Sequence, residues 1–213
     1  MEHILKKRAP GSKILCPTYP FADTERWEQN IPRTRMFDFP TIFWMGAYGH
    51  YYKLEWLYST LCKLVEEHPS YSVITLGAEK NFPPQYIFYD KWFHSSYVNT
   101  DLFYDVLFSI VADVGLAPLV MEPLDLSRSY LKVIEYGLIG VAPIVSNIGS
   151  FKFLPDDVVM KIDDNSHFAE AIEYMVNNDD YRNSIVNNLR KFISEKHDGI
   201  KVAKEWVELF GSL

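Results

Sequence analysis

Three side chains of different chemistry recur every three residues in the stretch SRSYLKVIEYGLIG. They are the hydroxyl of Ser129, the ammonium of Lys132 and the carboxylate of Glu135. On a helix these residues would lie within an arc of about 120° and span about 9 Å. Free N–H groups and the positive dipole end make a helix N-terminus suited to phosphate, and Glu135, two turns deeper, could accept from vicinal hydroxyls. The spacing therefore predicts a nucleoside-diphosphate site, with an ordinary solvated helix face as the alternative.

The flanking sequence predicts that this helix lies between two buried strands. The apolar run ADVGLAPL precedes it and APIVS follows it, with the loop MEPLDL leading in and Gly140 expected as the C-cap. We expect Leu131, Ile134 and Leu138 to face the sheet, opposite the polar residues. Ligands of parallel sheets bind where strands end and helices begin. This position favours the ligand-binding interpretation over the solvated one.

Short apolar runs and helical periodicity alternate along most of the chain. Runs bounded by glycine or proline predict strands over 41–46, 71–77, 85–92, 113–119 and 142–146. Spacings of three and four predict helices over 53–69, 100–112, 127–140, 166–178, 179–197 and 200–210, with Thr100 as an N-cap. Uniformly apolar strands alternating with helices are typical of an α/β fold. We therefore predict a Rossmann-like parallel sheet with helices on both faces and a helical C-terminal region.

Composition and charge exclude several classes of protein. The formal net charge of −7 argues against a general nucleic-acid binder, and a solvated terminus explains the only cationic run, KKR at 6–8. The two cysteines, Cys16 and Cys62, lie far apart without metal-ligand spacing, which favours a reduced cytoplasmic environment. No run approaches the roughly 20 apolar residues of a membrane span. Peripheral attachment to a membrane stays open.

Several of these motifs together resemble the C-terminal half of GT-B fold, group 1-type glycosyltransferases. The resemblance rests on ADVGLAPL, the helix with Ser129, Lys132 and the EYG at Glu135, and the strand APIVS. TIFWMGAYGHYYKLEWL similarly looks like the first strand and glycine loop of that half, and YSVITLG like its second strand. The likeness covers about residues 41–195 in order. It implies a domain over 41–213 that binds a UDP or GDP sugar, preceded by an irregular, interdomain-like segment over 1–40.

The resemblance also implies roles for individual residues. Glu135 would hydrogen-bond the ribose hydroxyls, and Lys132 with the helix dipole would stabilise the charge that builds on the leaving diphosphate. These two are the expected catalytic residues, and Ser129 would help to hold the diphosphate. Further donor-binding residues are expected at strand ends and in loops, and they are Gly46, Gly49, His50, Lys53, Trp92 and Glu122. Among them Trp92 is expected to stack on the base, and the two glycines to let their loop approach the donor.

Three departures from the family pattern bear on the site. Many members have two glutamates eight residues apart, whereas here Ser127 occupies the first position and Glu122 is the nearest substitute. His50 and Lys53 are the nearest candidates for the family's Arg and Lys, with packing and a solvated helix start as alternatives. No Asp-x-Asp pair follows a strand, and the three Asp-Asp pairs are typical of turns and caps. We therefore expect no metal requirement.

The length of the chain leaves the acceptor unexplained. GT-B enzymes have two such domains, and no acceptor domain is recognisable in these 213 residues. The first hypothesis is a glycosyltransferase, or its donor-binding half, with an acceptor domain or subunit supplied elsewhere and an unknown acceptor. The second is a non-catalytic module that binds a nucleotide sugar. A dinucleotide dehydrogenase ranks lower, because GAYGHYY is not a GxGxxG motif.

Overall fold

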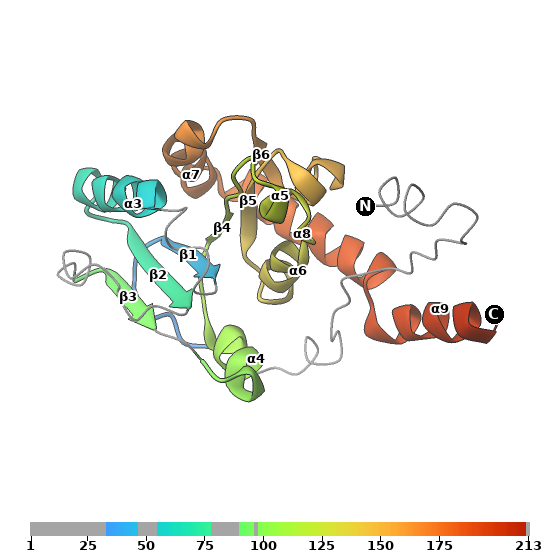
Figure 1. Ribbon diagram of the computed structural model, residues 1–213. Coiled ribbons are helices and arrows are strands. Elements are labelled where there is room, and N and C mark those ends of the chain that lie inside the picture. The colour runs from blue at the N-terminus through green and yellow to red at the C-terminus, as the bar shows by residue number, and fades with distance from the viewer. Residues whose placement is uncertain (1–32, 47–54, 78–89, 96–97, 212–213) are drawn as a thin grey trace.

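The computed structural model describes residues 33–46, 55–77, 90–95 and 98–211, which form an α/β fold around one sheet (Figure 1). Six parallel strands are arranged in the order β3-β2-β1-β4-β5-β6. The strands are β1 (Thr41–Gly46), β2 (Ser72–Gly77), β3 (Trp92–Ser95), β4 (Val114–Ala117), β5 (Ala142–Ser146) and β6 (Met160–Ile162). The chain reverses its direction of winding between β1 and β4. In open parallel sheets, this switch point is where ligands bind, outside the carboxyl ends of the strands.

Helices cover both faces of the sheet, as Figure 1 shows. One face is covered by α3 (Glu55–Glu67) and α7 (Phe168–Asn177), and the other by α4 (Thr100–Ser109), α6 (Leu131–Leu138) and most of α8 (Asp179–Lys196). Shorter elements join them, namely α5 (Pro123–Leu126) and the 3-10 turns η3 (Gly149–Phe153) and η4 (Asn165–His167). The last helix, α9 (Gly199–Gly211), follows α8 toward the C-terminus. The predicted fold class is confirmed.

Glycines end the first two strands because their backbones come very close together. Gly46 pairs with Gly77 in the β1–β2 register. A Cβ on Gly77 would lie 1.8 Å from the carbonyl oxygen of Gly46, and the φ of Gly77 is +156°. Only glycine fits such an approach. The two strands therefore finish level with each other at the carboxyl edge.

The predicted elements agree with the structure best where apolar strands are sharply bounded. Strands over 41–46 and 142–146 are confirmed residue for residue. Of the strand predicted over 85–92, residues 85–89 lie outside the described residues, residues 90 and 91 form a turn, and β3 begins at Trp92. The N-cap of α4 is Asn99 rather than Thr100, because the Asn99 side chain accepts from the Asp101 N–H. The three-residue strand β6 was not predicted.

The segment before β1 is irregular over residues 33–40 and is held by two arginines. Arg33 donates to the carbonyl of Ile139 at 2.7 Å, and Arg35 pairs with Asp113 at 2.5 Å. These contacts attach the segment to the domain, and a domain boundary at residue 40 stays a prediction. In the part of the chain that the structure describes, no helix has the length and apolarity needed to cross a membrane.

Candidate functional site

Helix α6 begins later than the sequence predicts. Its first residue is Leu131 and Tyr130 occupies the N-cap, so Ser129 lies in the connection ahead of the helix. The expectation that Ser129 occupies the first turn on the same stripe as Lys132 is wrong. The N–H of Val133 is the first to bond back, to the Tyr130 carbonyl at 2.9 Å. The amides of Leu131 and Lys132 lie ahead of that bond, at the positive end of the helix.

A buried carboxylate holds the segment just ahead of α6. Asp125 is only 4% exposed and lies in α5, within the segment expected to be a plain loop. Its oxygens accept from the backbone N–H of Val120 at 3.2 Å and from Nε of Arg128 at 2.9 Å. This arrangement folds residues 120–128 into a compact unit. The two residues after this unit, 129 and 130, connect it to α6.

The C-terminal end of α6 has the predicted glycine cap. Gly140 adopts a φ of +72°, and its N–H bonds to the carbonyl of Gly137 at 3.1 Å. The N–H of Val141 bonds to the carbonyl of Tyr136 at 2.9 Å. Together these two bonds form the Schellman motif. The turn directs the chain straight into β5.

Helix α6 is buried on two sides, and this corrects the expected orientation of its polar residues. Toward the sheet, Tyr136 packs on Gly115 and donates its hydroxyl to the Leu116 carbonyl at 2.7 Å. Toward α8, a Cβ on Gly137 would lie 2.3 Å from Cδ1 of Ile193, so the two helices pack very closely. Glu135 on the same helix is only 9% exposed. It is a buried carboxyl rather than part of a solvent-facing stripe.

Lys132 and Glu135 have shifted pKa values because α6 is buried. Burial lowers the pKa of Lys132 to about 8, against the attraction of Glu135. Burial likewise raises the pKa of Glu135 to about 7, against the attraction of Lys132. An ammonium and a carboxyl that both titrate near neutrality at the edge of a sheet are typical of functional sites.

Lys132 also contacts an aromatic ring from the opposite side of the sheet. Its Nζ lies 5.5 Å from the centroid of Trp44, which packs with the core on the α3 side. Trp44 in turn lies against Gly46, where a Cβ would come within 2.6 Å of Cζ2 of the indole. Gly46, Trp44 and Lys132 therefore meet at the carboxyl edge of β1. Of the residues expected in the glycine loop, Gly46 is at this edge, whereas Gly49, His50 and Lys53 lie outside the described residues.

The neighbouring strand ends are joined by a small hydrogen-bond network. The hydroxyl of Ser146, at the end of β5, accepts from the Leu119 N–H at 2.9 Å and donates to Oδ1 of Asn165 at 2.7 Å. The amide nitrogen of Asn165 donates to the Leu119 carbonyl at 2.9 Å. This network fixes the floor of the candidate site beside α6.

Trp92 lies in the core rather than at the carboxyl edge. It opens β3, opposite Val73 near the start of β2, and is 7% exposed. Its ring stacks on Tyr58 with centroids 6.1 Å apart, and its Nε1 donates to the Thr75 hydroxyl at 3.1 Å. These contacts give Trp92 a packing role. We therefore leave it out of the site, although the sequence suggested it as a base-stacking residue.

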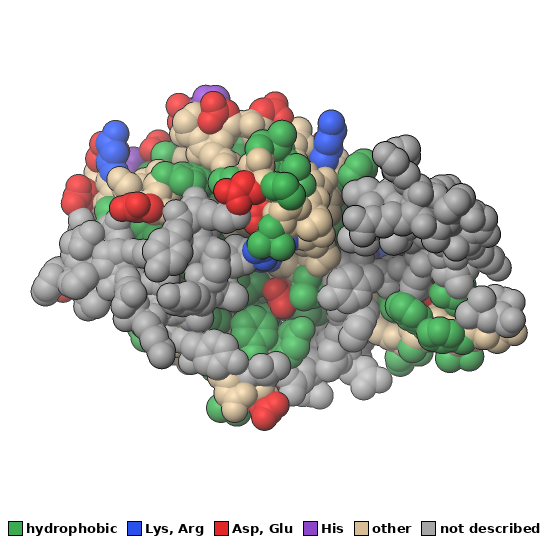
Figure 2. All heavy atoms as spheres, viewed as in Figure 1, with side chains coloured by type: hydrophobic (Ala, Val, Ile, Leu, Met, Phe, Trp, Pro, Cys, Tyr) green, Lys and Arg blue, Asp and Glu red, His purple; other side chains and the backbone are tan. Residues whose placement is uncertain are grey.

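The rim of the site carries an acidic residue and several exposed hydrophobic side chains. Glu122 is exposed at the N-cap of α5, and its side chain makes no capping bond. The exposed hydrophobic residues nearby in the chain are Met121, Leu124 and Leu126, and η3, which contacts α5, adds Phe153. Figure 2 shows hydrophobic side chains at the surface around the position of α5. The carboxyl edge is thus bordered by an apolar surface.

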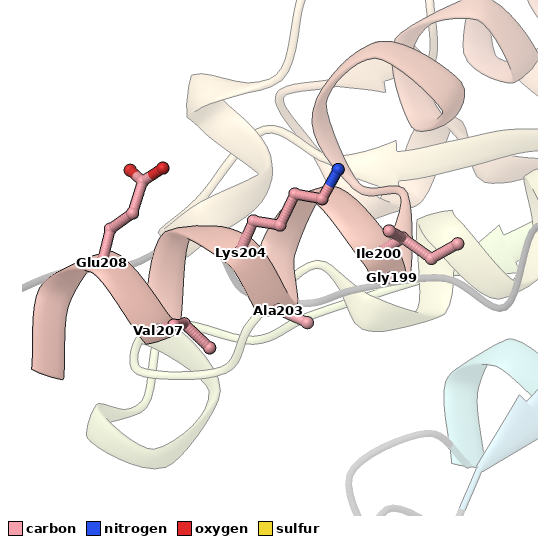
Figure 3. A pocket seen from close by; sticks show the side chains of 6 residues that line it. All are labelled: Gly199, Ile200, Ala203, Lys204, Val207 and Glu208. Atoms are coloured by element: carbon pink, nitrogen blue, oxygen red, sulfur yellow. The ribbon is translucent and has the colours of Figure 1, made fainter. Parts of the chain in front are cut away.

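A separate open hollow of about 450 Å³ lies along α9. Figure 3 shows its lining side chains on successive turns of this helix, and they include Ile200, Lys204 and Val207. The hollow shares no lining residue with the carboxyl edge.

Among the described residues, no group of three His, Cys, Asp or Glu side chains is placed to hold a metal ion. The expectation about metals remains a prediction.

One residue of the site escaped the sequence analysis. Trp44 lies inside an apolar run and was read as part of a buried strand. The available signal was its position, two residues before the glycine that ends β1, on a strand expected at the switch point. The structure thus brings Gly46, Trp44, Lys132 and Glu135 to the same edge, with Ser129 just ahead of α6.

Comparison with known proteins gives the fold. No family model matches the chain, and no curated protein matches its sequence. The C-terminal domain of a group 1 glycosyltransferase, LpcC from Francisella tularensis, matches with a TM-score of 0.58 and 11% identity, covering 85% of this chain and 96% of that domain. TarM from S. aureus, solved with UDP, gives a TM-score of 0.67 and 15% identity over 98% of this chain and 41% of TarM.

A third match comes from Anabaena. HepE, solved in complex with UDP and glucose, gives a TM-score of 0.63 and 12% identity over 83% of this chain and 49% of HepE. The chain therefore spans less than half the length of TarM and HepE. It has the Rossmann-like fold of the C-terminal half of a GT-B glycosyltransferase.

Proposed function

We propose that the carboxyl edge of this sheet binds a nucleoside-diphosphate sugar and that the chain acts as the donor-binding half of a glycosyltransferase. The observation that carries the proposal is the position of Lys132 and Glu135, three residues apart on α6. Both groups are desolvated, have opposite charge and lie at the switch point of the sheet. The structural matches to HepE with UDP and glucose and to TarM with UDP support the same class of ligand.

The chemistry assigned to each group follows from its position. Lys132 and the amides at the start of α6 would hold the diphosphate, and Glu135 would accept from the ribose hydroxyls. During transfer the bond between the anomeric carbon and the diphosphate oxygen breaks, and the electron pair stays on that oxygen. The Lys132 ammonium would stabilise the charge developing there. Ser129 and the glycine backbone at Gly46 would complete the phosphate side.

The acceptor has to be presented by something other than the described residues of this domain. The chain covers 41% of TarM and 49% of HepE. We propose that an acceptor-binding domain or subunit meets the carboxyl edge, where the exposed side chains of Met121, Leu124 and Phe153 provide an apolar border. The acceptor itself is unspecified. The two widely spaced cysteines favour the cytoplasm as the location.

A non-catalytic nucleotide-sugar-binding module is the second candidate. It is favoured by the absence of a glutamate at position 127, which is Ser127, and by the exposed position of Glu122. Neither observation affects binding of the nucleotide itself. The two candidates therefore differ only in whether the bound sugar is transferred.

A ligand panel tests the binding claim. Thermal unfolding of the full chain is followed with UDP, GDP, their sugars and NAD, for the wild type, Glu135→Gln and the control Glu195→Gln on the exposed part of α8. We expect one nucleoside diphosphate or its sugar to stabilise the wild type and Glu195→Gln but not Glu135→Gln. A folded wild type that responds to none of them would contradict the site. Donor turnover, with and without an acceptor-domain partner, then separates the enzyme from the module.

A further inference from the structure

Two buried tryptophans beside the same tyrosine differ in one respect. Trp44 and Trp92 are 2% and 7% exposed, and their rings lie 5.8 Å and 6.1 Å from the ring of Tyr58. The Nε1–H of Trp92 donates to the Thr75 hydroxyl. The Nε1–H of Trp44 is also buried, but none of the described residues accepts from it. A buried donor without an acceptor is uncommon in a native protein and calls for an explanation.

The six-membered ring of the Trp44 indole lies against the carboxyl end of β1. A Cβ on Gly46 would lie 2.6 Å from Cζ2, 2.8 Å from Cη2 and 3.4 Å from Cε2 of Trp44. Cε2 is bonded to Nε1, so the N–H group is one bond away from the ring atoms that lie against Gly46. The backbone at Gly46 can lie this close only because it has no side chain. The unpaired donor is therefore next to the strand end where the proposed ligand binds.

The ring of Trp44 also determines the surroundings of Lys132. Its π-system lies 5.5 Å from Nζ, and an aromatic face attracts a cation most strongly where water is excluded. The other charges that act on Lys132 are those of Glu135, Arg128 and Asp125. An oxygen that accepts from the indole N–H and also contacts the ammonium must be one that tolerates two donors. An anionic phosphate oxygen has this property.

We propose that Trp44 is a residue of the donor site: its face positions the Lys132 ammonium, and its Nε1–H donates to an oxygen of the donor diphosphate. This inference rests on the proposed function and makes Trp44, rather than Trp92, the tryptophan that serves the ligand. It adds a specific contact from β1 to the contacts from α6. The diphosphate would then lie between a strand end and a helix start.

The indole N–H signals of the ¹⁵N-labelled full chain report on this contact without any change to the core. The probes are UDP, GDP and inorganic pyrophosphate, and the signals are assigned with Trp44→Phe and Trp92→Phe. We expect the Trp44 signal to move downfield on saturation with the diphosphate that binds, and the Trp92 signal to stay in place. Movement of Trp92 with a stationary Trp44 would overturn the proposal.

Affinities of the two variants test the same claim energetically. Trp44→Phe keeps an aromatic face but loses the donor, and we expect it to weaken diphosphate binding about tenfold, as for a hydrogen bond to a charged group. Trp92→Phe removes a core N–H of similar burial and should bind within about twofold of the wild type. Equal losses in the two variants would show a general packing effect and overturn the assignment.

A measurement on the ligand-free protein separates this inference from the proposed function. The titration of Lys132 is followed by ¹³C NMR of the lysine side chains in the wild type, Trp44→Leu and Trp92→Leu. We expect the pKa of Lys132 to change in Trp44→Leu and to stay the same in Trp92→Leu, because only Trp44 contacts the ammonium. If the wild type binds no nucleotide while this change is seen, the proposed function fails and the positioning role stands. An unchanged pKa in Trp44→Leu overturns the positioning role.

Discussion

Lys132 and Glu135 lie three residues apart on α6, and burial brings their pKa values within reach of each other, to about 8 and about 7. Burial disfavours the charged form of each group, the ammonium of Lys132 and the carboxylate of Glu135. A ligand that carries both negative charge and hydroxyl groups would satisfy the two at once. Sites that bind such ligands commonly keep groups in this condition until the ligand arrives.

Glu135 predicts a specific dependence of stability on pH. The unfolded chain loses this proton near 4.5, whereas the folded chain keeps it to about 7, so the contribution of Glu135 is full below 4.5 and is lost as the pH rises to 7. Glutamine does not titrate, so we expect the free energy of unfolding of Glu135→Gln, relative to that of the wild type, to rise by roughly 1–2 kcal/mol from pH 5 to pH 7.5. Urea unfolding at the two pH values measures this. A constant difference between the proteins would show that Glu135 has an ordinary pKa.

The lack of a side chain at Gly46 leaves room for the indole of Trp44 beside the candidate site. Alanine there would place a Cβ 2.6 Å from Cζ2 of Trp44 and displace the indole. We expect Gly46→Ala to lose about 1–3 kcal/mol of stability and to weaken nucleotide binding. Gly211→Ala is the matched control, since nothing lies within 4 Å of a Cβ at that position. Chemical denaturation and calorimetry measure both effects, and equal behaviour of the two variants would argue against the tight contact.

The hydrogen bonds of Ser146 should contribute measurably to the stability of the fold beside the candidate site. Alanine at this position would leave the buried Leu119 N–H without its acceptor. We expect Ser146→Ala to cost about 1–3 kcal/mol. The control is Ser184→Ala on α8, whose exposed hydroxyl bonds only locally to Tyr181 and should matter by less than about 0.5 kcal/mol. The two free energies of unfolding should differ clearly, and a loss no larger than that of the control would show that the network is dispensable.

The sheet was predictable because its strands carry the signal locally. Thr41–Gly46 and Ala142–Ser146 are apolar throughout and end sharply, so their bounds follow from composition alone. β6 has only three residues and pairs with a single neighbouring strand, so its sequence pattern is too short to be recognised as a strand. The start of β3 at Trp92 was not predictable, because the aromatic run before it has the same composition as a strand. A short or aromatic segment can be identified as a strand only when the neighbouring strands of the sheet are known.

The site was predictable in part. The spacing of Lys132 and Glu135 singled out the right helix, but α6 also packs closely on α8 through Gly137, and α8 follows more than 40 residues later. The segment ahead of α6 is held by Asp125, whose hydrogen-bond partners are local but whose burial depends on the tertiary fold. In the sequence Trp44 is typical of a core residue, and only the structure shows that its buried N–H has no acceptor among the described residues. Local periodicity identifies a face of a helix, and only packing decides what covers that face.

The most direct test of the account is titration calorimetry of UDP and GDP into the wild type, Lys132→Met and the control Lys191→Met, whose side chain is 74% exposed on α8. We expect one of the two nucleotides to bind the wild type and Lys191→Met equally and to bind Lys132→Met at least about tenfold more weakly. At pH 8 the wild type should also take up a fraction of a proton, because phosphate would raise the pKa of Lys132. Equal affinity in all three proteins, or no binding to folded wild type, would contradict the central claim.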